Sequence, residues 1–153
     1  MVKIIKPTAS DVPDLVFLGR LMHQESRSRG RPFMADNVAR YALSVISDEY
    51  NFFVRMTRDD QGSPTGFIVG KIEADVINND IFGKEVYLYV RPDSRGTRAF
   101  LLLFRSLEKW FKDQGDVVES KVGTTSEIQT DKTCALYKKM GYNYSGSFFV
   151  KSF

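Results

Sequence analysis

The chain has 153 residues, 42% of them hydrophobic and 27% charged, with a formal net charge of +3. This length suits one domain with its own core, and the composition excludes a disordered or fibrous chain. Cys134 is the only cysteine and His23 the only histidine, which excludes an internal disulfide and a zinc cluster. We therefore expect a single domain over residues 1–153, no metal site, and a reducing, cytoplasmic setting.

The amino terminus and the overall charge bear on the kinds of partner. The apolar run within residues 2–5 is too short for a signal peptide, and no stretch of about eighteen apolar residues follows, so we expect no membrane partner. The modest excess of basic residues favours anionic ligands, such as phosphorylated cofactors, nucleic acid or acidic proteins. Charge alone does not choose among them.

The first half of the chain predicts a strand, two helices and a hairpin. Strand periodicity stops at Pro7, helical periodicity then occurs twice, and a basic loop over residues 27–32 separates the two helices. A turn cluster at residues 59–64 joins two β-rich runs. The ranges expected are a strand over 2–6, helices over 11–22 and 36–47, and strands over 50–57 and 66–76.

The second half alternates strands and helices. The strongest strand signal ends before Pro92. Gly115 and Gly141 each follow a helical pattern, at the position where a glycine in the left-handed conformation commonly ends a helix. The ranges expected are strands over 85–90, 117–122 and 142–150, and helices over 98–114 and 130–140. This order predicts a mixed α/β fold with helices packed on a sheet.

The turn between residues 90 and 99 is the first candidate site. A helix begins with unpaired N–H groups and a positive dipole end, so the run Arg95-Gly96-Thr97-Arg98-Ala99 indicates a site for a phosphate or pyrophosphate. Gly96 permits close backbone approach, and Arg95 and Arg98 add positive charge. A plain turn is the alternative, because loops of this composition are common.

The segment from Val90 to Ala99 resembles the acetyl-CoA signature of the GNAT superfamily of N-acetyltransferases. That resemblance implies a central, mostly antiparallel sheet flanked by about four helices, with acetyl-CoA as co-substrate. In the family, the loop amides hold the pyrophosphate and the preceding strand aligns the pantetheine arm. The residues implied as cofactor-binding are Leu88, Tyr89, Val90, Arg95, Gly96, Thr97, Arg98, Ala99 and Phe100. Arg98 and Phe100 stand where the family usually has small residues.

Two further segments support the resemblance. Residues 130–142 look like the family's Asn-x-x-Ala-x-x-Leu-Tyr-x-x-x-Gly-Phe helix, with Thr130, implied as cofactor-binding, in place of Asn. Residues 22–26 resemble a Met-His-x-Glu-Ser sequence of some members, which implies that His23, Glu25 and Ser26 border the acceptor site. The loop over residues 95–99 is also similar to that of short GNAT-like proteins of bacteria and bacterial viruses.

The resemblance implies two catalytic residues. Tyr137 is expected to return a proton to the CoA thiolate, and Glu85 to take one from the amine, with Glu25 and Glu119 as alternates. The plain alternatives are that Tyr137 only packs in the core and that Glu85 is a solvated strand-end residue.

The expected function is transfer of an acetyl group from acetyl-CoA to a primary amine, on a small molecule or a protein, in a ternary complex. A non-catalytic acyl-CoA-binding or regulatory module with this fold, and a basic nucleic-acid- or protein-binding domain, remain open. Of these partners nucleic acid is the less favoured, and the sequence is compatible with a homodimer. Nothing in the sequence identifies the acceptor.

Overall fold

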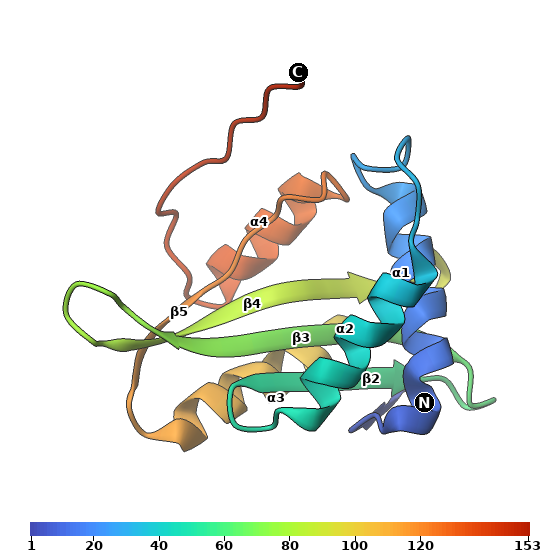
Figure 1. Cartoon of the computed structure of the whole chain (residues 1–153), viewed down its shortest axis with the longest axis horizontal. Helices are drawn as coiled ribbons and strands as arrows, with labels where there is room; N and C mark the ends of the chain where they lie inside the picture. Colours follow the sequence, from blue (N-terminus) through green and yellow to red (C-terminus); the bar gives the residue numbers. More distant parts are fainter.

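The computed structural model describes residues 1–153 and contains one five-stranded sheet in the order β1-β2-β3-β4-β5 (Figure 1). The strands are β1 (Lys3–Ile5), β2 (Phe52–Arg58), β3 (Pro64–Ala74), β4 (Ile81–Val90) and β5 (Val117–Lys121). The helices are α1 (Val12–Glu25), α2 (Ala35–Ser47), α3 (Ala99–Gln114) and α4 (Thr130–Lys139), with short 3-10 turns at Ala9–Asp11 and Pro92–Ser94.

The sheet is antiparallel between neighbours from β1 to β4, and only the β4–β5 pair is parallel. This arrangement confirms the mixed α/β fold with a mostly antiparallel sheet and four helices. β4 begins at Ile81, earlier than the strand expected over residues 85–90, because Ile81 to Lys84 pair with both β3 and β5.

Two hydrophobic cores lie on opposite faces of the sheet. On one face, Leu18 of α1 and Val45 of α2 pack with Met56 of β2. On the other face, Phe104 and Leu107 of α3 are buried with Ile68 of β3. The alternation of side chains along a strand explains how one strand serves both cores. The two faces thus hold α1 and α3 on either side of β4.

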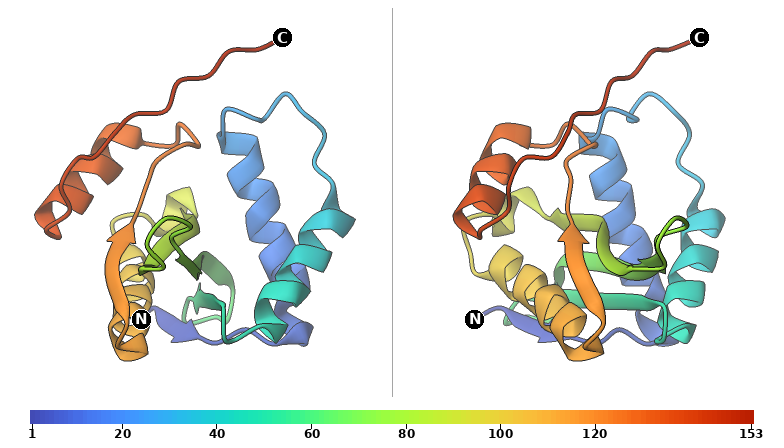
Figure 2. Two further views of the ribbon diagram at one scale, coloured as in Figure 1. Left: turned by 60° about the vertical axis from the view of Figure 1, so that its left-hand side comes forward. Right: turned by 90° about the vertical axis from the view of Figure 1, so that its left-hand side faces the viewer.

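β4 and β5 pair over only part of their length. Their register ends at Lys84 opposite Lys121, while β4 continues to Val90 without a strand partner on that edge. The β3–β4 register shifts between Val69 and Gly70, where Val86 is the extra residue of a β-bulge. Figure 2 shows the chain after β5 rising away from the sheet towards α4. The strands therefore open into a split beside residues 85–90.

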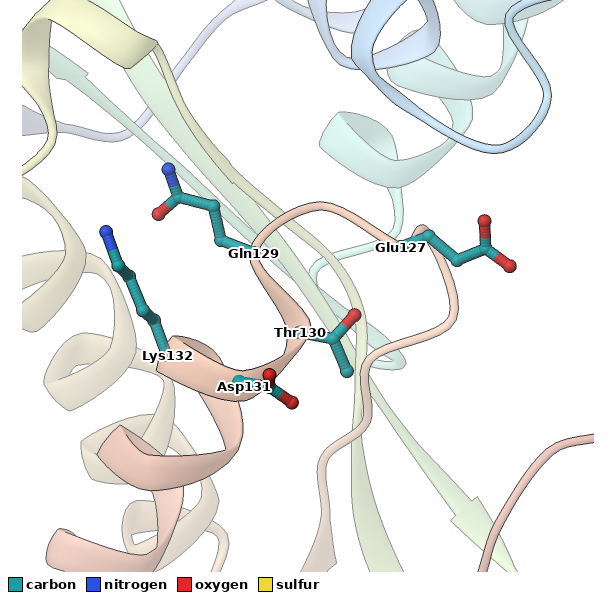
Figure 3. Close-up of a pocket in the computed structure, with 5 residues that line it drawn as sticks. All are labelled: Glu127, Gln129, Thr130, Asp131 and Lys132. Atoms are coloured by element: carbon teal, nitrogen blue, oxygen red, sulfur yellow. The ribbon is translucent and has the colours of Figure 1, made fainter.

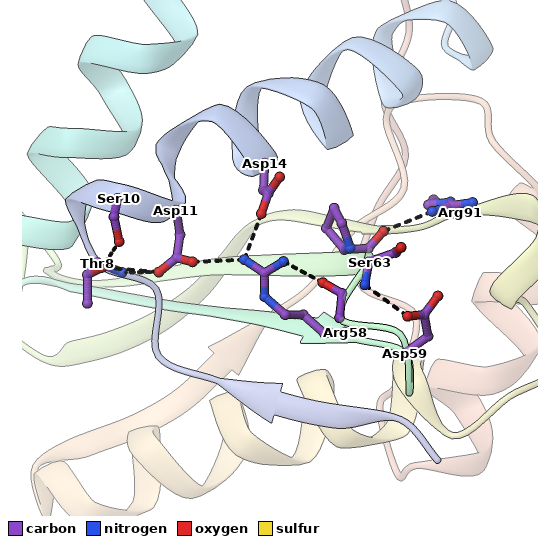
Figure 4. Close-up of polar contacts among 10 residues, drawn as sticks. Thr8, Ser10, Asp11, Asp14, Arg58, Asp59, Ser63 and Arg91 are labelled. Atoms are coloured by element: carbon purple, nitrogen blue, oxygen red, sulfur yellow. Dashed lines mark hydrogen bonds and ion pairs between the residues drawn. The ribbon is translucent and has the colours of Figure 1, made fainter.

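An ion cluster fixes the first turn of α1 against the β2–β3 hairpin (Figure 4). Arg58 Nη2 lies 2.8 Å from Asp11 Oδ1 and 2.6 Å from Asp14 Oδ2, and Arg58 Nη1 donates to Gly62 O at 2.7 Å. The backbone N–H of Thr8, and then Arg58, lower the pKa of Asp11 below its usual value. This cluster sets the direction in which α1 crosses the sheet.

The prediction of a strand over residues 142–150 is wrong. Gly141 has a φ of +91° and ends α4, and Tyr142 is held by hydrogen bonds to Ser120 and Glu108, but the chain beyond Tyr142 joins no sheet. β-propensity reflects packing on neighbouring strands, and Ser145, Gly146 and Ser147 offer little to pack. Phe148 and Phe149 are 83% and 93% exposed as a result.

None of the four helices combines the length and the apolar character that crossing a membrane requires.

Candidate active site

The turn before α3 presents backbone N–H groups that no protein atom accepts. The amides of Gly96, Arg98, Phe100 and Leu101 have no hydrogen-bond acceptor in the chain, whereas Ala99 N donates to Thr97 Oγ1 at 3.2 Å. Gly96 adopts a φ of +85°, which favours glycine and turns the chain into the helix. We name residues 95–101 the amide loop. It suits a phosphate or pyrophosphate, because free amides and the positive end of a helix face the same side.

The Arg95 side chain, which was expected to add positive charge at a phosphate site, makes its polar contacts within the chain. Its Nε donates to Val90 O at 2.9 Å, and its Nη2 lies 2.8 Å from Glu25 Oε2. The Tyr89 hydroxyl donates to the other oxygen of Glu25, and the guanidinium lies 5.7 Å from the centre of the Tyr89 ring. We name Glu25, Tyr89 and Arg95 the Glu25 cluster. It joins the end of α1 to the end of β4 and the start of the amide loop.

The structure brings the two expected catalytic residues together. Tyr137 Oη lies 3.3 Å from Glu85 Oε2, and Gly123 N lies 3.5 Å from the same oxygen. Burial raises the pKa of the Glu85 carboxyl to about 7, against the opposing effect of these two donors. Glu85 is therefore a partly buried group beside the strand split and not a solvated strand end. A carboxyl that titrates near neutrality is suited to accept and return a proton.

Tyr137 is both a core residue and a site residue. Its side chain is 6% exposed, and its ring lies near Phe100, Phe104 and Tyr142. Burial, and then the charge of Glu85, raise the pKa of the Tyr137 hydroxyl, so the phenol stays protonated at neutral pH. The ring thus packs in the core while the hydroxyl faces Glu85, so packing does not exclude the expected role as an acid.

His23 and Ser26, which were expected at the acceptor site, hold the loop that follows α1. His23 Nε2 lies 2.7 Å from Arg31 O, and its ring packs near Phe33. Ser26 is buried and donates through Oγ to His23 O at 2.9 Å. Glu119, the remaining alternate base, is exposed on β5 with Lys121 at 3.7 Å. Of the three candidate carboxylates, Glu25, Glu85 and Glu119, only Glu85 is hydrogen-bonded to Tyr137.

Thr130 lies apart from the amide loop, in a hollow at the start of α4 (Figure 3). Its lining is entirely polar, and Figure 3 shows Glu127 directed away from the other side chains. The residues that line it are Glu127, Gln129, Thr130, Asp131 and Lys132. Because sites for acyl and pantetheine groups usually have apolar walls, the hollow does not suit these groups by itself.

Several features of the site had no signal in the sequence. The bulge at Val86, the Tyr89 hydroxyl and the Gly123 amide each contribute through contacts with residues far along the chain. The free amides before and within the first turn of α3 were, in contrast, accessible to sequence reasoning, since a helix begins with unpaired N–H groups.

A family model described as the acetyltransferase (GNAT) family matches residues 18–142. The chain belongs to the GNAT acetyltransferase family. No curated protein matches the sequence. The fold of this GNAT member also resembles those of many solved structures, and the matches reported next share too few identical residues to show more than the fold.

Three of these structures illustrate the range of proteins with this fold. Glucosamine-6-phosphate N-acetyltransferase from Arabidopsis thaliana is 16% identical with a TM-score of 0.77, covering 100% of this chain and 99% of that one. AAC(6')-Iy, in complex with the bisubstrate analogue CoA-S-monomethyl-acetylneamine, is 15% identical with a TM-score of 0.76, covering 99% and 98%. A transcriptional regulator from Bacillus halodurans is 14% identical with a TM-score of 0.80, covering 100% of both chains.

Proposed function

We propose that this GNAT family member transfers the acetyl group of acetyl-CoA directly to a primary amine in a ternary complex. The observation that carries the proposal is the hydrogen-bonded pair of Glu85 and Tyr137 at the mouth of the β4–β5 split. Membership in the acetyltransferase family and the free amides before α3 support acetyl-CoA as the donor.

The chain offers matching groups for the parts of acetyl-CoA. The free amides of Gly96, Arg98, Phe100 and Leu101 would hold the pyrophosphate. The edge of β4 at Leu88 to Val90 has no strand partner, and its backbone groups other than Val90 O, which accepts from Arg95 Nε, would align the pantetheine arm as an added strand does. The thioester would then lie near Tyr137, and positioning would supply most of the rate.

The Glu85–Tyr137 pair can move the proton that the reaction must transfer. An ammonium acceptor loses a proton to the Glu85 carboxylate, and the free amine attacks the thioester carbonyl carbon. The new C–N bond forms as the C–S bond breaks, and Tyr137 donates its proton to the departing thiolate. The acylated nitrogen still carries one proton more than the amide product, and it releases that proton to water. Glu85 then returns its proton to the Tyr137 phenolate across their hydrogen bond, so the pair ends as it began.

The loop after α1 favours an acceptor that carries an acidic group. Its Arg27 N donates to Ser126 O at 3.0 Å, which joins it to the segment whose Gly123 reaches Glu85. Arg29 and Arg31 are exposed and have no carboxylate partner, whereas Glu25 is already paired with Arg95. Guanidinium groups without a carboxylate partner at this rim would attract carboxylate or phosphate and repel polycations.

The catalytic pair is tested with Tyr137→Phe and Glu85→Gln in an assay of CoA thiol release against a panel of primary amines. Each change should lower kcat by about a hundredfold or more and leave the Kd for acetyl-CoA within about threefold. Tyr142→Phe is the matched control, because its hydroxyl contacts Ser120 and Glu108 and should leave kcat unchanged. Full activity in Tyr137→Phe would remove the proposal for this pair.

The acceptor preference is tested with glucosamine 6-phosphate against glucosamine, two amines that differ in a phosphate group. The phosphorylated amine should have a KM about tenfold lower, and Arg29→Ala/Arg31→Ala should abolish that difference. A lower KM for glucosamine would contradict an acidic acceptor.

Two results would favour the rival functions, one from these assays and one from a nucleic-acid-binding measurement. Binding of acetyl-CoA without thiol release for any amine would favour the non-catalytic regulatory module. The fold is also similar to that of a protein described as a transcriptional regulator, which is compatible with this alternative. Salt-dependent binding of nucleic acid that CoA leaves unchanged would favour the nucleic-acid-binding domain.

A further inference from the structure

The Glu25 cluster lies outside the chemistry described above, yet it joins both substrate sides of the site. Glu25 is the last residue of α1, Tyr89 lies near the end of β4, and Arg95 opens the amide loop. The Glu25 carboxylate therefore contacts two residues that are distant in the sequence: Tyr89, 64 positions further along the chain, and Arg95, 70 positions further.

We infer that Glu25 is a positioning residue for acetyl-CoA, which acts through Arg95 to hold the amide loop in its binding conformation. This inference rests on the proposed function for the identity of the ligand. It differs from the simpler interpretation in which the Arg95 guanidinium itself contacts the pyrophosphate and Glu25 contacts the acceptor.

The donor geometry of Arg95 supports the positioning role. Its Nε and Nη2 are both occupied within the chain, by Val90 O at 2.9 Å and Glu25 Oε2 at 2.8 Å. Two bonds in different directions fix a planar guanidinium, and so fix the backbone one residue before Gly96. The Arg95 and Glu25 side chains are 22% and 28% exposed, so water competes with this pair less than with a fully exposed one.

The last residues of the amide loop are held by α3, because Ala99 is buried in the core, whereas residues 95–98 are held mainly by local bonds, among them Thr97 Oγ1 to Ser94 O at 2.6 Å. Within the loop, the bonds from Arg95 N to Pro92 O and from Thr97 N to Ser94 O are both 3.3 Å long, near the limit for a hydrogen bond. No side chain lies within 4 Å of where a Cβ at Gly96 would stand. The contacts of the Arg95 side chain therefore connect the residues before α3 to the end of β4 and to α1.

The two interpretations predict opposite effects of removing the carboxylate. If Glu25 positions the loop, Glu25→Ala should raise both the Kd and the KM for acetyl-CoA by about tenfold and leave kcat nearly unchanged. If Arg95 is a phosphate ligand restrained by Glu25, Glu25→Ala should leave acetyl-CoA binding unchanged or tighten it.

A double variant and a conservative variant of Glu25 further distinguish the two interpretations. Glu25→Ala/Arg95→Ala should bind no more weakly than Arg95→Ala alone, because Arg95→Ala already removes the contact through which Glu25 acts. Glu25→Gln should bind within about threefold of the parent protein, since an amide oxygen still accepts from Arg95. The control is Glu49→Ala, which removes an exposed ion pair with Lys6 and should change nothing.

The experiment is calorimetric titration of acetyl-CoA into these variants, joined to limited trypsin cleavage after Arg98 in the absence of ligand. We expect faster cleavage at Arg98 in Glu25→Ala than in the Glu25→Gln or Glu49→Ala variants, which reports the loop independently of acetyl-CoA. Unchanged cleavage and unchanged or tighter binding in Glu25→Ala would overturn the inference. Absence of acetyl-CoA binding in the parent protein would instead contradict the proposed function, and the cleavage rates would still test the loop.

Discussion

At the scale of single residues, the environment that is proposed to make Glu85 a base also has a cost in stability. Burial raises the pKa of its carboxyl to about 7 from a usual value of 4.5. The folded state therefore disfavours the charged form, while the unfolded chain ionises freely. The resulting penalty is absent below pH 4.5, grows as the pH rises towards 7, and is constant above it.

This behaviour predicts that Glu85→Gln stabilises the protein at alkaline pH. We expect a gain in the free energy of unfolding of about 2 kcal/mol at about pH 8, and almost none at about pH 4, where both side chains are neutral. Urea unfolding at the two pH values measures the difference. Equal gains at both values would show that Glu85 is not held in a raised-pKa environment.

In the proposed reaction, the same group sets the pH dependence of turnover. The rate should rise as the pH passes through about 7, because only the ionised Glu85 accepts the proton of the amine. Rate profiles between about pH 6 and about pH 9 for the parent and for Glu85→Gln test this prediction. A rise of the same shape in both proteins would assign the base to another group.

At the scale of elements, Arg58 joins the first turn of α1 to the β2–β3 hairpin. Its side chain is 21% exposed and contacts both Asp11 and Asp14, so loss of the guanidinium leaves two carboxylates without their partner. Since α1 carries Glu25 at its other end, the cluster also determines where Glu25 meets β4.

We expect Arg58→Met to lower the free energy of unfolding by about 2 kcal/mol near neutral pH. The pKa of Asp11 is lowered, so its contribution exists above the usual carboxyl pKa and disappears as the pH falls through the lowered value. The effect of Arg58→Met should therefore shrink in acid. Lys109→Met is the control, because its pair with Asp113 is exposed and should contribute at most about 0.5 kcal/mol.

At the scale of the whole molecule, the carboxyl-terminal segment is the part least connected to the rest. The polar and cation–π contacts within residues 144–153 join Tyr144 to Ser147 and Lys151 to Phe153, both inside the segment itself. Tyr142 is the last residue with hydrogen bonds to the sheet and helices.

A chain shortened after Asn143 should therefore keep its Tm within about 3 °C of the parent chain, since little buried surface is lost. Thermal unfolding followed by circular dichroism measures this. A fall of about 10 °C or more would mean that the segment packs on the body of the protein in solution.

The sequence predicted elements better than their connections. Strong local signals, such as helical periodicity before Gly115 and the strand before Pro92, correspond to α3 and β4. The strand expected over residues 142–150 failed because its aromatic residues find no neighbouring strand, which only the tertiary structure decides.

The same limit applies to the candidate site. The motif indicated Glu85, Tyr137 and Arg95, and the structure adds which groups they contact. That Glu85 is buried beside Tyr137, and that Arg95 is paired with Glu25, depend on the bulge in β4 and on the direction of α1. Local sequence patterns carry no information about such long-range contacts.

The central claim is that the amide loop binds acetyl-CoA, and calorimetric titration of the parent protein beside Gly96→Ala tests it most directly. Gly96 has a φ of +85°, so a side chain there strains the loop, whereas the control Gly30→Ala adds a methyl group into open space. We predict a micromolar Kd for the parent and Gly30→Ala, and a Kd at least about tenfold weaker for Gly96→Ala. No binding to the parent protein, or equal binding by all three, would contradict the claim.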